Sequence, residues 1–235
     1  MGCYTTARVA AGRVMHLERH AHRLERDALR LGLPGPPRSG IEQLCLETAR
    51  SVFGRGDGIV RVEWTASRGS PMALRATTRP LGSTRRSWRA RSSPLRHPGP
   101  EDRRHTKPID VEIYDQARRE AQAMGVDEVL LFDVNGWLVE GGRSGFLVVT
   151  AAGDLLTPEL ALGGVESLGL EIVGEATPEL REARLDRAAL LDARELMAVN
   201  AVRGVVPITR LDELAVGQGM AGPWCRRLEP LFAAP

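Results

Sequence analysis

Apolar residues in the first part of the chain recur with helical spacing and then alternate as in strands. Residues 16–33 carry leucines and alanines on one helical face and end at a glycine before a Pro-Gly-Pro-Pro breaker, so we expect an amphipathic helix there. A second helix is expected over 40–53, and the apolar runs at 58–67 and 72–81 are typical of two strands. Residues 1–84 are therefore predicted to form a small N-terminal α+β domain.

Helical spacing returns after a basic stretch, and a hairpin follows. The helix is predicted over 110–124, and the residues expected to face inward are Ile113, Ala117, Ala121 and Met124. Two apolar runs then occupy 128–134 and 137–141. Asn135-Gly136 between them is the strongest short signal for a hairpin with a type I′ turn, because such a turn needs positive φ at both central residues.

Glu140 stands on the second strand of this hairpin. Its neighbours Leu138 and Val139 are apolar. The carboxylate therefore either faces solvent at a sheet edge or is buried with a partner.

The remaining pattern predicts short strands and two helices. Strands are expected at 146–150, 154–157, 181–185, 196–202 and 205–209, and helices at 165–173 and 224–232. Residues 109–235 are therefore predicted to form a larger C-terminal α/β domain. The fold class expected for the chain is α/β (α+β), with two units.

A basic stretch lies between the two predicted domains. Its arginines are interrupted by Ser and Pro, and they are Arg85, Arg86, Arg89, Arg91, Arg96, Arg103 and Arg104. We interpret residues 85–108 as a solvated inter-domain linker, with a phosphate or carboxylate site as the alternative. The net charge is only +2, and Trp88 is the only aromatic residue among the arginines, so a nucleic-acid partner is not expected.

Composition excludes several classes of protein. With 235 residues and 43% hydrophobic content, the chain can bury a substantial core. It has no run of about 18 uncharged apolar residues, and its N-terminus lacks the apolar run of a secretory signal, so we expect a soluble cytoplasmic protein without membrane contact. The three cysteines are far apart and odd in number, so neither a disulfide nor a structural metal is predicted.

Lys107 is the only lysine among the 32 basic residues. A coding bias that replaces surface lysines by arginines accounts for the many arginines, but it does not explain why Lys107 remains. Arginine stays protonated, whereas a lysine can lose its proton and form a Schiff base. The lone lysine is therefore either kept for chemistry or a chance survivor.

Several segments follow an order that matches one known family over nearly the whole chain. They are YTTARV at 4–9, HAHRL at 20–24, HTK at 105–107, DEVLL at 127–131, GWLVE at 136–140 and VNAVRGVVPI at 199–208. In this order and rough spacing they resemble the class IV aminotransferases, and within that family most closely the aminodeoxychorismate lyases.

The resemblance implies a fold-type IV enzyme of two α/β domains with the cofactor pyridoxal 5′-phosphate (PLP) between them. Lys107 would attach the cofactor as a Schiff base. Glu140 would face the pyridine nitrogen and keep the ring protonated. Arg23 on the first helix would bind the phosphate, for which a planar bidentate cation is suited.

Two further segments would complete the cofactor site by the same resemblance. In relatives, an LPGITR segment opens a helix whose N-terminal amides bind the phosphate. The corresponding segment reads LGGVES here, so Gly164, Val165 and Glu166 would take this place, and Glu166 would bring an anion toward an anion. Asn200 and Ala201 would replace a Gly-Thr pair of the branched-chain aminotransferases.

The activity implied by the resemblance is pyruvate elimination from 4-amino-4-deoxychorismate, which gives 4-aminobenzoate for folate biosynthesis. Thr6 favours this lyase, because its hydroxyl could relay a proton where branched-chain aminotransferases commonly carry glycine. A class IV aminotransferase that acts on branched-chain or D-amino acids is the alternative. Arg8 and Arg96 are candidate anchors for substrate carboxylates, and the resemblance implies a homodimer.

Two other features depart from the family pattern. Gly145 replaces an asparagine that is usual after Glu140. The chain begins at the YTTARV segment, so we expect the usual N-terminal strands to be missing. A degenerate, non-catalytic member of the fold is therefore a third interpretation.

Overall fold

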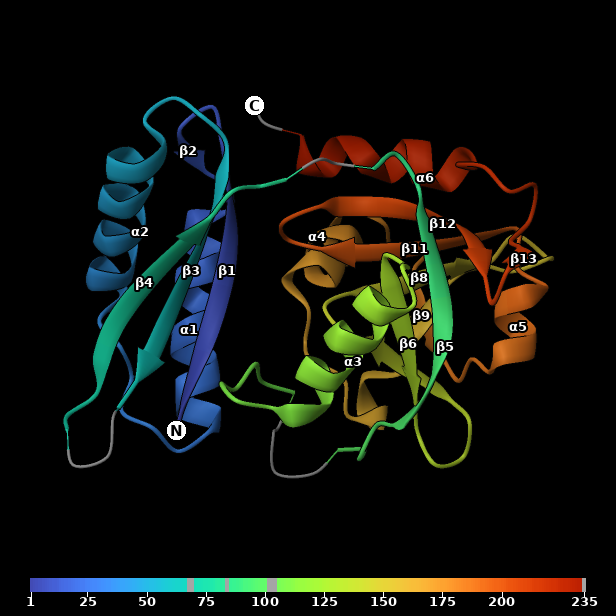
Figure 1. Cartoon of the computed structure of the whole chain (residues 1–235), viewed down its shortest axis with the longest axis horizontal. Helices are drawn as coiled ribbons and strands as arrows, with labels where there is room; N and C mark the ends of the chain where they lie inside the picture. Colours follow the sequence, from blue (N-terminus) through green and yellow to red (C-terminus); the bar gives the residue numbers. More distant parts are fainter. Residues whose placement is uncertain (67–69, 83–84, 101–104, 234–235) are drawn as a thin grey trace. The chain divides into compact units, whose positions relative to one another are not determined.

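The computed structural model describes residues 1–66, 70–82, 85–100 and 105–233, which form two compact units (Figure 1). Unit 1 contains the described residues up to 82 together with 105–110. Unit 2 contains 85–100 and 111–233. The segment that carries Lys107 is thus part of unit 1, whereas Glu140 belongs to unit 2.

Unit 1 is a four-stranded antiparallel sheet with two helices on one face. The sheet has the order β2-β1-β3-β4, and its elements are β1 (Gly2–Ala10), β2 (Arg13–Val14), β3 (Gly58–Thr65), β4 (Ala73–Arg79), α1 (Leu17–Arg30) and α2 (Arg38–Phe53). The two predicted helices and the predicted strands at 58–67 and 72–81 are confirmed. β1 was not predicted as a strand.

Alternation along β1 separates a core face from an open face. The buried positions include Cys3 and Val9, which pack against α1 and α2. Tyr4, Thr6 and Arg8 lie on the other face and are half-buried. Because side chains alternate along a strand, these three residues point the same way.

Unit 2 is a strongly curled sheet with helices packed on its outer side (Figure 1). Its strands have the order β10-β9-β8-β11-β12-β5-β6-β7, with β13 paired to β12. The strands are β5 (Trp88–Arg96), β6 (Glu128–Phe132), β7 (Leu138–Gly141), β8 (Gly145–Val149), β9 (Leu155–Pro158), β10 (Arg181–Ala183), β11 (Glu195–Asn200), β12 (Gly204–Leu211) and β13 (Leu214–Ala215). The helices are α3 (Glu112–Ala123), α4 (Leu168–Ala176), α5 (Arg187–Leu191) and α6 (Pro223–Leu228).

Both faces of this sheet are apolar. On β8, Phe146 and Val148 enter the inner core, whereas Leu147 and Val149 pack toward α4 and α6. The sheet curls so far that the Leu138 amide of β7 donates a hydrogen bond to the Leu185 carbonyl, just after β10, at 2.7 Å. Burial on both faces explains why these strands read as continuous hydrophobic runs.

β5 lies inside the stretch that we interpreted as a solvated linker. It pairs with β12 and β6, and Trp88 and Ala90 are buried in the inner core. Arg91 forms an ion pair with Glu213 at 2.8 Å. The linker interpretation is wrong for residues 88–96, because arginines that find partners can alternate with the buried residues of a strand.

The predicted hairpin joins β6 and β7, but its turn is not type I′. Gly136 has a φ of 85°, whereas Asn135 is not among the residues with positive φ. The Asp133 carboxylate accepts hydrogen bonds from the Asn135 amide at 2.9 Å and the Trp137 amide at 2.8 Å. These bonds close a longer loop, in which only one residue needs the left-handed conformation.

Other boundaries also differ from the predictions. α4 begins at Leu168 rather than at 165, and Met124 is 50% exposed because α3 ends at Ala123. The closing helix α6 continues as a 3-10 turn over Glu229–Phe232. Within the described residues, no helix combines the length and apolar character needed to cross a bilayer.

Candidate functional site

Lys107 lies on a short segment that runs beside β1 in unit 1. The Tyr4 amide donates to the Lys107 carbonyl at 3.1 Å, and the Ile109 amide donates to the Gly2 carbonyl at 2.9 Å. An antiparallel bridge joins Cys3 to Pro108. The lysine backbone is therefore held by β1, an interior strand of the sheet.

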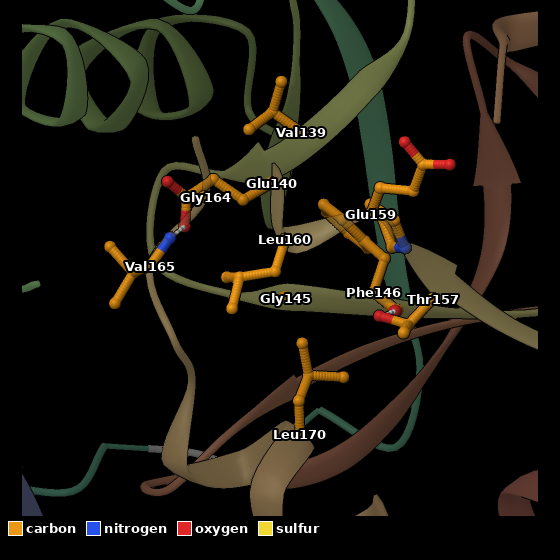
Figure 2. Close-up of a pocket in the computed structure, with 11 residues that line it drawn as sticks. Val139, Glu140, Gly145, Phe146, Thr157, Glu159, Leu160, Gly164, Val165 and Leu170 are labelled. Carbon is orange, nitrogen blue, oxygen red and sulfur yellow. Dashed lines mark hydrogen bonds between the residues drawn. The ribbon is translucent and has the colours of Figure 1, made fainter. Parts of the chain in front are cut away.

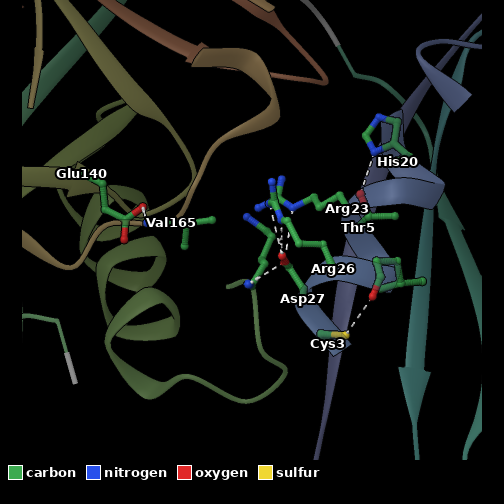
Figure 3. Close-up of polar contacts among 10 residues, drawn as sticks. Cys3, Thr5, His20, Arg23, Arg26, Asp27, Glu140 and Val165 are labelled. Atoms are coloured by element: carbon green, nitrogen blue, oxygen red, sulfur yellow. Dashed lines mark hydrogen bonds and ion pairs between the residues drawn. The ribbon is translucent and has the colours of Figure 1, made fainter. Parts of the chain in front are cut away.

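Asp27 of α1 holds the other backbone group of this lysine. The Lys107 amide donates to Asp27 Oδ2 at 3.0 Å, and the same oxygen lies 3.5 Å from Arg23 Nε. Asp27 is fully buried, and Arg26 pairs with its other oxygen at 3.2 Å. Figure 3 shows Asp27 at the centre of these contacts.

Arg23 is buried. A side chain that binds a phosphate must be held in place, so this burial agrees with the predicted role. Its side chain belongs to the buried stripe of α1. Within the described residues, its Nη2 atom is buried without a hydrogen-bond partner. An unpaired buried guanidinium nitrogen is costly, so this atom suits an anionic ligand.

The open face of β1 carries two of the predicted site residues, Thr6 and Arg8. Lys107 Nζ lies 5.1 Å from the centre of the Tyr4 ring, which is on the same face. The Arg61 guanidinium of β3 lies 3.6 Å from the centre of that ring. Unit 1 therefore brings together the lysine amine, an aromatic ring and several hydrogen-bonding groups.

His20 and Thr5 form a buried pair behind this face. His20 Nδ1 and Thr5 Oγ1 are 2.6 Å apart. Burial, together with the nearby charges of Arg23 and His16, lowers the pKa of His20 to about 3. The ring is therefore neutral at neutral pH and adds no positive charge beside Arg23.

Glu140 in unit 2 is buried, and a β-bulge sets its direction. Leu131 pairs with Glu140 and Phe132 with Leu138, so Val139 is an extra residue on β7. Bulges re-aim side chains. Without the bulge, Glu140 would share the face of Leu138, which lies in the apolar inner core.

The Glu140 carboxylate is surrounded by hydrogen-bond donors. The Tyr114 hydroxyl of α3 donates to Oε1 at 2.5 Å, and the Val165 amide donates to Oε2 at 3.2 Å. His97 Nε2 lies 3.4 Å from Oε1 but makes no hydrogen bond within the described residues. Because His97 Nδ1 accepts a bond from the Gly99 amide, the neutral ring carries its proton on Nε2, toward Glu140.

Glu140 also lines a small hollow in unit 2, which Figure 2 shows. The hollow has a cavity volume of about 20 Å³, and its wall includes Phe146, Thr157 and Leu170. This volume is enough for about one water molecule, so the hollow is not a cofactor pocket.

The expectation that Gly164, Val165 and Glu166 stand at the start of a helix is wrong, whereas their role in binding the cofactor stays a prediction. α4 begins at Leu168, with Ser167 as its N-cap residue, so these three residues precede the helix. The Val165 amide bonds to Glu140 and is therefore not free for a phosphate.

Asn200 and Ala201 lie at the turn between β11 and β12. Asn200 Oδ1 accepts bonds from the amides of Val202 and Arg203 at 3.0 and 2.9 Å. A Cβ atom on Gly169, in the first turn of α4, would come within 3.0 Å of Asn200 Cα. The start of α4 therefore packs closely against the loop that carries Asn200. Unit 2 thus brings Asn200 together with α4.

Gly145 has a steric explanation in this chain. A Cβ atom at this position would come within 2.7 Å of the Leu170 side chain. The leucine occupies the space that a larger residue would need, so glycine and Leu170 fit as a pair.

Neither Arg96 nor the end of the basic stretch is part of a cluster of predicted site residues in the part of the chain that the structure describes. Arg96 is exposed at the end of β5. Arg103 and Arg104 lie outside the described residues. Three residues beside the predicted site residues were not identified from the sequence: Asp27, His97 and Tyr114. Asp27 could have been found, because it lies one helical turn after Arg23.

The curled sheets, the fixed lysine and the buried hairpin glutamate define a mixed α/β protein of fold-type IV. The family model described as amino-transferase class IV matches residues 2–211, and the chain belongs to this family. The family depends on PLP, so the predicted family, fold class and cofactor are confirmed.

The known proteins to which this chain is similar are named for two different activities. The branched-chain-amino-acid aminotransferase of Escherichia coli K12 is 31% identical over 117 residues, which span 48% of this chain and 38% of that protein. The branched-chain aminotransferase structure from Thermoproteus uzoniensis has a TM-score of 0.86 at 23% identity, and the match covers 98% of this chain and 84% of that one. A Legionella pneumophila protein with a provisional assignment as a 4-amino-4-deoxychorismate lyase has a TM-score of 0.83 at 18% identity, over 97% and 88%.

We predict that His20 makes the apoprotein sensitive to acid. The folded-state pKa of about 3 lies below the ordinary value of 6.5, so the unfolded chain binds a proton first as the pH falls. The stabilisation is complete above pH 6.5 and is lost progressively toward pH 3. Urea unfolding of the apoprotein at several pH values in this window should show a steeper loss for wild type than for His20→Gln. Equal slopes would contradict the prediction.

Proposed function

We propose that the chain is a PLP-dependent enzyme in which Lys107 attaches the cofactor. The observation that carries the proposal is that the only lysine of the chain has its backbone fixed on both sides, by Tyr4 and by Asp27. A nucleophile whose backbone is fixed can present its amine in one direction. When bound, PLP supplies an electron sink for the bond that breaks in the substrate.

Arg23 is proposed to bind the cofactor phosphate. Its buried Nη2 atom has no hydrogen-bond partner within the described part of the chain, and a phosphate oxygen would supply one. With Arg23 and Arg26 beside Asp27, two cations and one anion leave a net positive charge for the phosphate.

Glu140 is proposed to accept a hydrogen bond from the ring nitrogen of the cofactor. A carboxylate offers about four lone-pair positions. Among the described residues, Tyr114 donates to Oε1 and the Val165 amide donates to Oε2, which leaves room on Oε2 for another donor. A carboxylate at this position would keep the ring nitrogen of the cofactor protonated.

We propose a 4-amino-4-deoxychorismate lyase-like activity, in which pyruvate elimination gives 4-aminobenzoate. Thr6 supports it, because its hydroxyl group lies on the same face of β1 as Tyr4, whose ring faces the Lys107 amine. A class IV aminotransferase is the second candidate, favoured by the 31% identity to the E. coli enzyme. Arg8 and Arg96 remain proposed substrate anchors, and a homodimer remains part of the proposal.

The first test concerns attachment of the cofactor. Borohydride reduction of the protein loaded with PLP should fix the cofactor to the peptide that contains Lys107, because no other lysine is present. Lys107→Ala should lose both the label and turnover. Peptide mapping by mass spectrometry checks this, and a label on the N-terminal amine would contradict the proposal.

The second test concerns Glu140. Glu140→Gln keeps the shape but removes the charge, so PLP should stay bound while kcat falls by orders of magnitude. Glu159→Gln is the matched control, because Glu159 lines the same hollow but pairs with Arg184 at 3.0 Å. A rate near that of wild type in Glu140→Gln would show that the carboxylate has only a structural role.

The third test separates the two candidate activities. Purified protein loaded with PLP is supplied with 4-amino-4-deoxychorismate, and separately with branched-chain or D-amino acids and a keto-acid acceptor. Release of 4-aminobenzoate and pyruvate is the expected result. Amino transfer without that release would favour the aminotransferase, and failure to bind PLP would favour a non-catalytic member of the fold.

A further inference from the structure

Asp27 connects the two residues of unit 1 to which the proposed function assigns the attachment of the cofactor and the binding of its phosphate. Its Oδ2 atom accepts the Lys107 amide and lies within reach of Arg23 Nε. We propose that Asp27 is a positioning residue for PLP, which fixes the lysine and the phosphate-binding arginine relative to each other. This inference rests on the proposed function.

The placement of Asp27 supports a role beyond the stability of the helix. Asp27 is fully buried on α1, and its carboxylate bonds to a segment 80 residues away in the chain. Buried carboxylates are costly unless donors surround them. Here two arginines and the Lys107 amide provide those donors, so the carboxylate has few alternative positions.

The contact with Arg23 also sets which nitrogen of the guanidinium remains available. Asp27 faces Nε, at 3.5 Å, whereas Nη2 is buried without a hydrogen-bond partner in the described residues. Because the guanidinium is planar and rigid, fixing Nε fixes the direction of Nη2. The charge of Asp27 is offset by Arg26, so the anion does not cancel the attraction of Arg23 for a phosphate.

Two substitutions separate the two contacts. Asp27→Asn keeps an oxygen that can accept the Lys107 amide but removes the charge that holds Arg23. Asp27→Ala removes both contacts. We expect the Asn variant to bind PLP about tenfold more weakly while its affinity for pyridoxal, which lacks the phosphate, changes by less than about twofold. The Ala variant should in addition lose covalent labelling by borohydride.

The measurements are titrations of the apoproteins with PLP and with pyridoxal, followed by absorbance and by borohydride labelling. Arg23→Gln, alone and combined with Asp27→Asn, completes a double-mutant cycle. The ratio of the PLP and pyridoxal affinities should fall in each single variant, and the double variant should show little further loss. The ratio isolates the phosphate contact, because a general loss of folding would weaken both ligands.

A control variant keeps the comparison specific. Asp57→Asn changes an exposed carboxylate of unit 1 that also accepts a backbone amide, that of Ala11, at 2.8 Å. This variant should keep the wild-type affinity ratio within about twofold.

The outcomes distinguish the inference from the proposed function. A wild-type affinity ratio in Asp27→Asn, together with a reduced ratio in Arg23→Gln, would overturn the inference alone. If the wild-type protein does not bind PLP, both fail. Should the Asn variant not fold, Asp27→Glu keeps the charge but moves the carboxylate by one methylene, and an unchanged ratio with unchanged labelling there would overturn the inference.

Discussion

The cost of burying a carboxylate shapes both units of this protein. Asp27 and Glu140 are both buried, and each is bonded to at least one donor from a distant part of the chain. Removing one partner of such a group leaves a charge without compensation, so the donors must be held as firmly as the carboxylate. In unit 1 this requirement joins α1 to the Lys107 segment. In unit 2 it joins β7 to α3 and to the segment before α4.

Much of the fold could be predicted from hydrophobic periodicity. The helices near 16–33 and 40–53 follow the pattern because their buried faces repeat regularly. Most strands of the curled sheet could be located as continuous apolar runs, because they are buried on both faces. β5 was missed because its arginines read as solvated, although they alternate with buried residues such as Trp88 and Ala90. The turn after β6 was misread because the Asp133 side chain, rather than the Asn-Gly pair, closes the loop.

The candidate site was less accessible to sequence reasoning. The resemblance to a family drew attention to Lys107, Glu140 and Arg23, and their roles remain predictions. Tyr114 reaches Glu140 only because of a bulge, which leaves no signal in the periodicity of β7. Likewise, Val165 was expected to face a phosphate, but the late start of α4 lets its amide bond to Glu140 instead. Backbone irregularities of one or two residues decided these contacts.

The bulge at Val139 makes the direction of Glu140 depend on a residue count rather than on its own identity. Deleting Val139 would restore regular alternation, and the glutamate would then turn toward the apolar interior beside Leu138. Such a deletion would leave the acidic residue in the sequence while removing it from Tyr114. In comparisons with other proteins of this fold, the length of the strand before the glutamate is thus as informative as the presence of the glutamate itself.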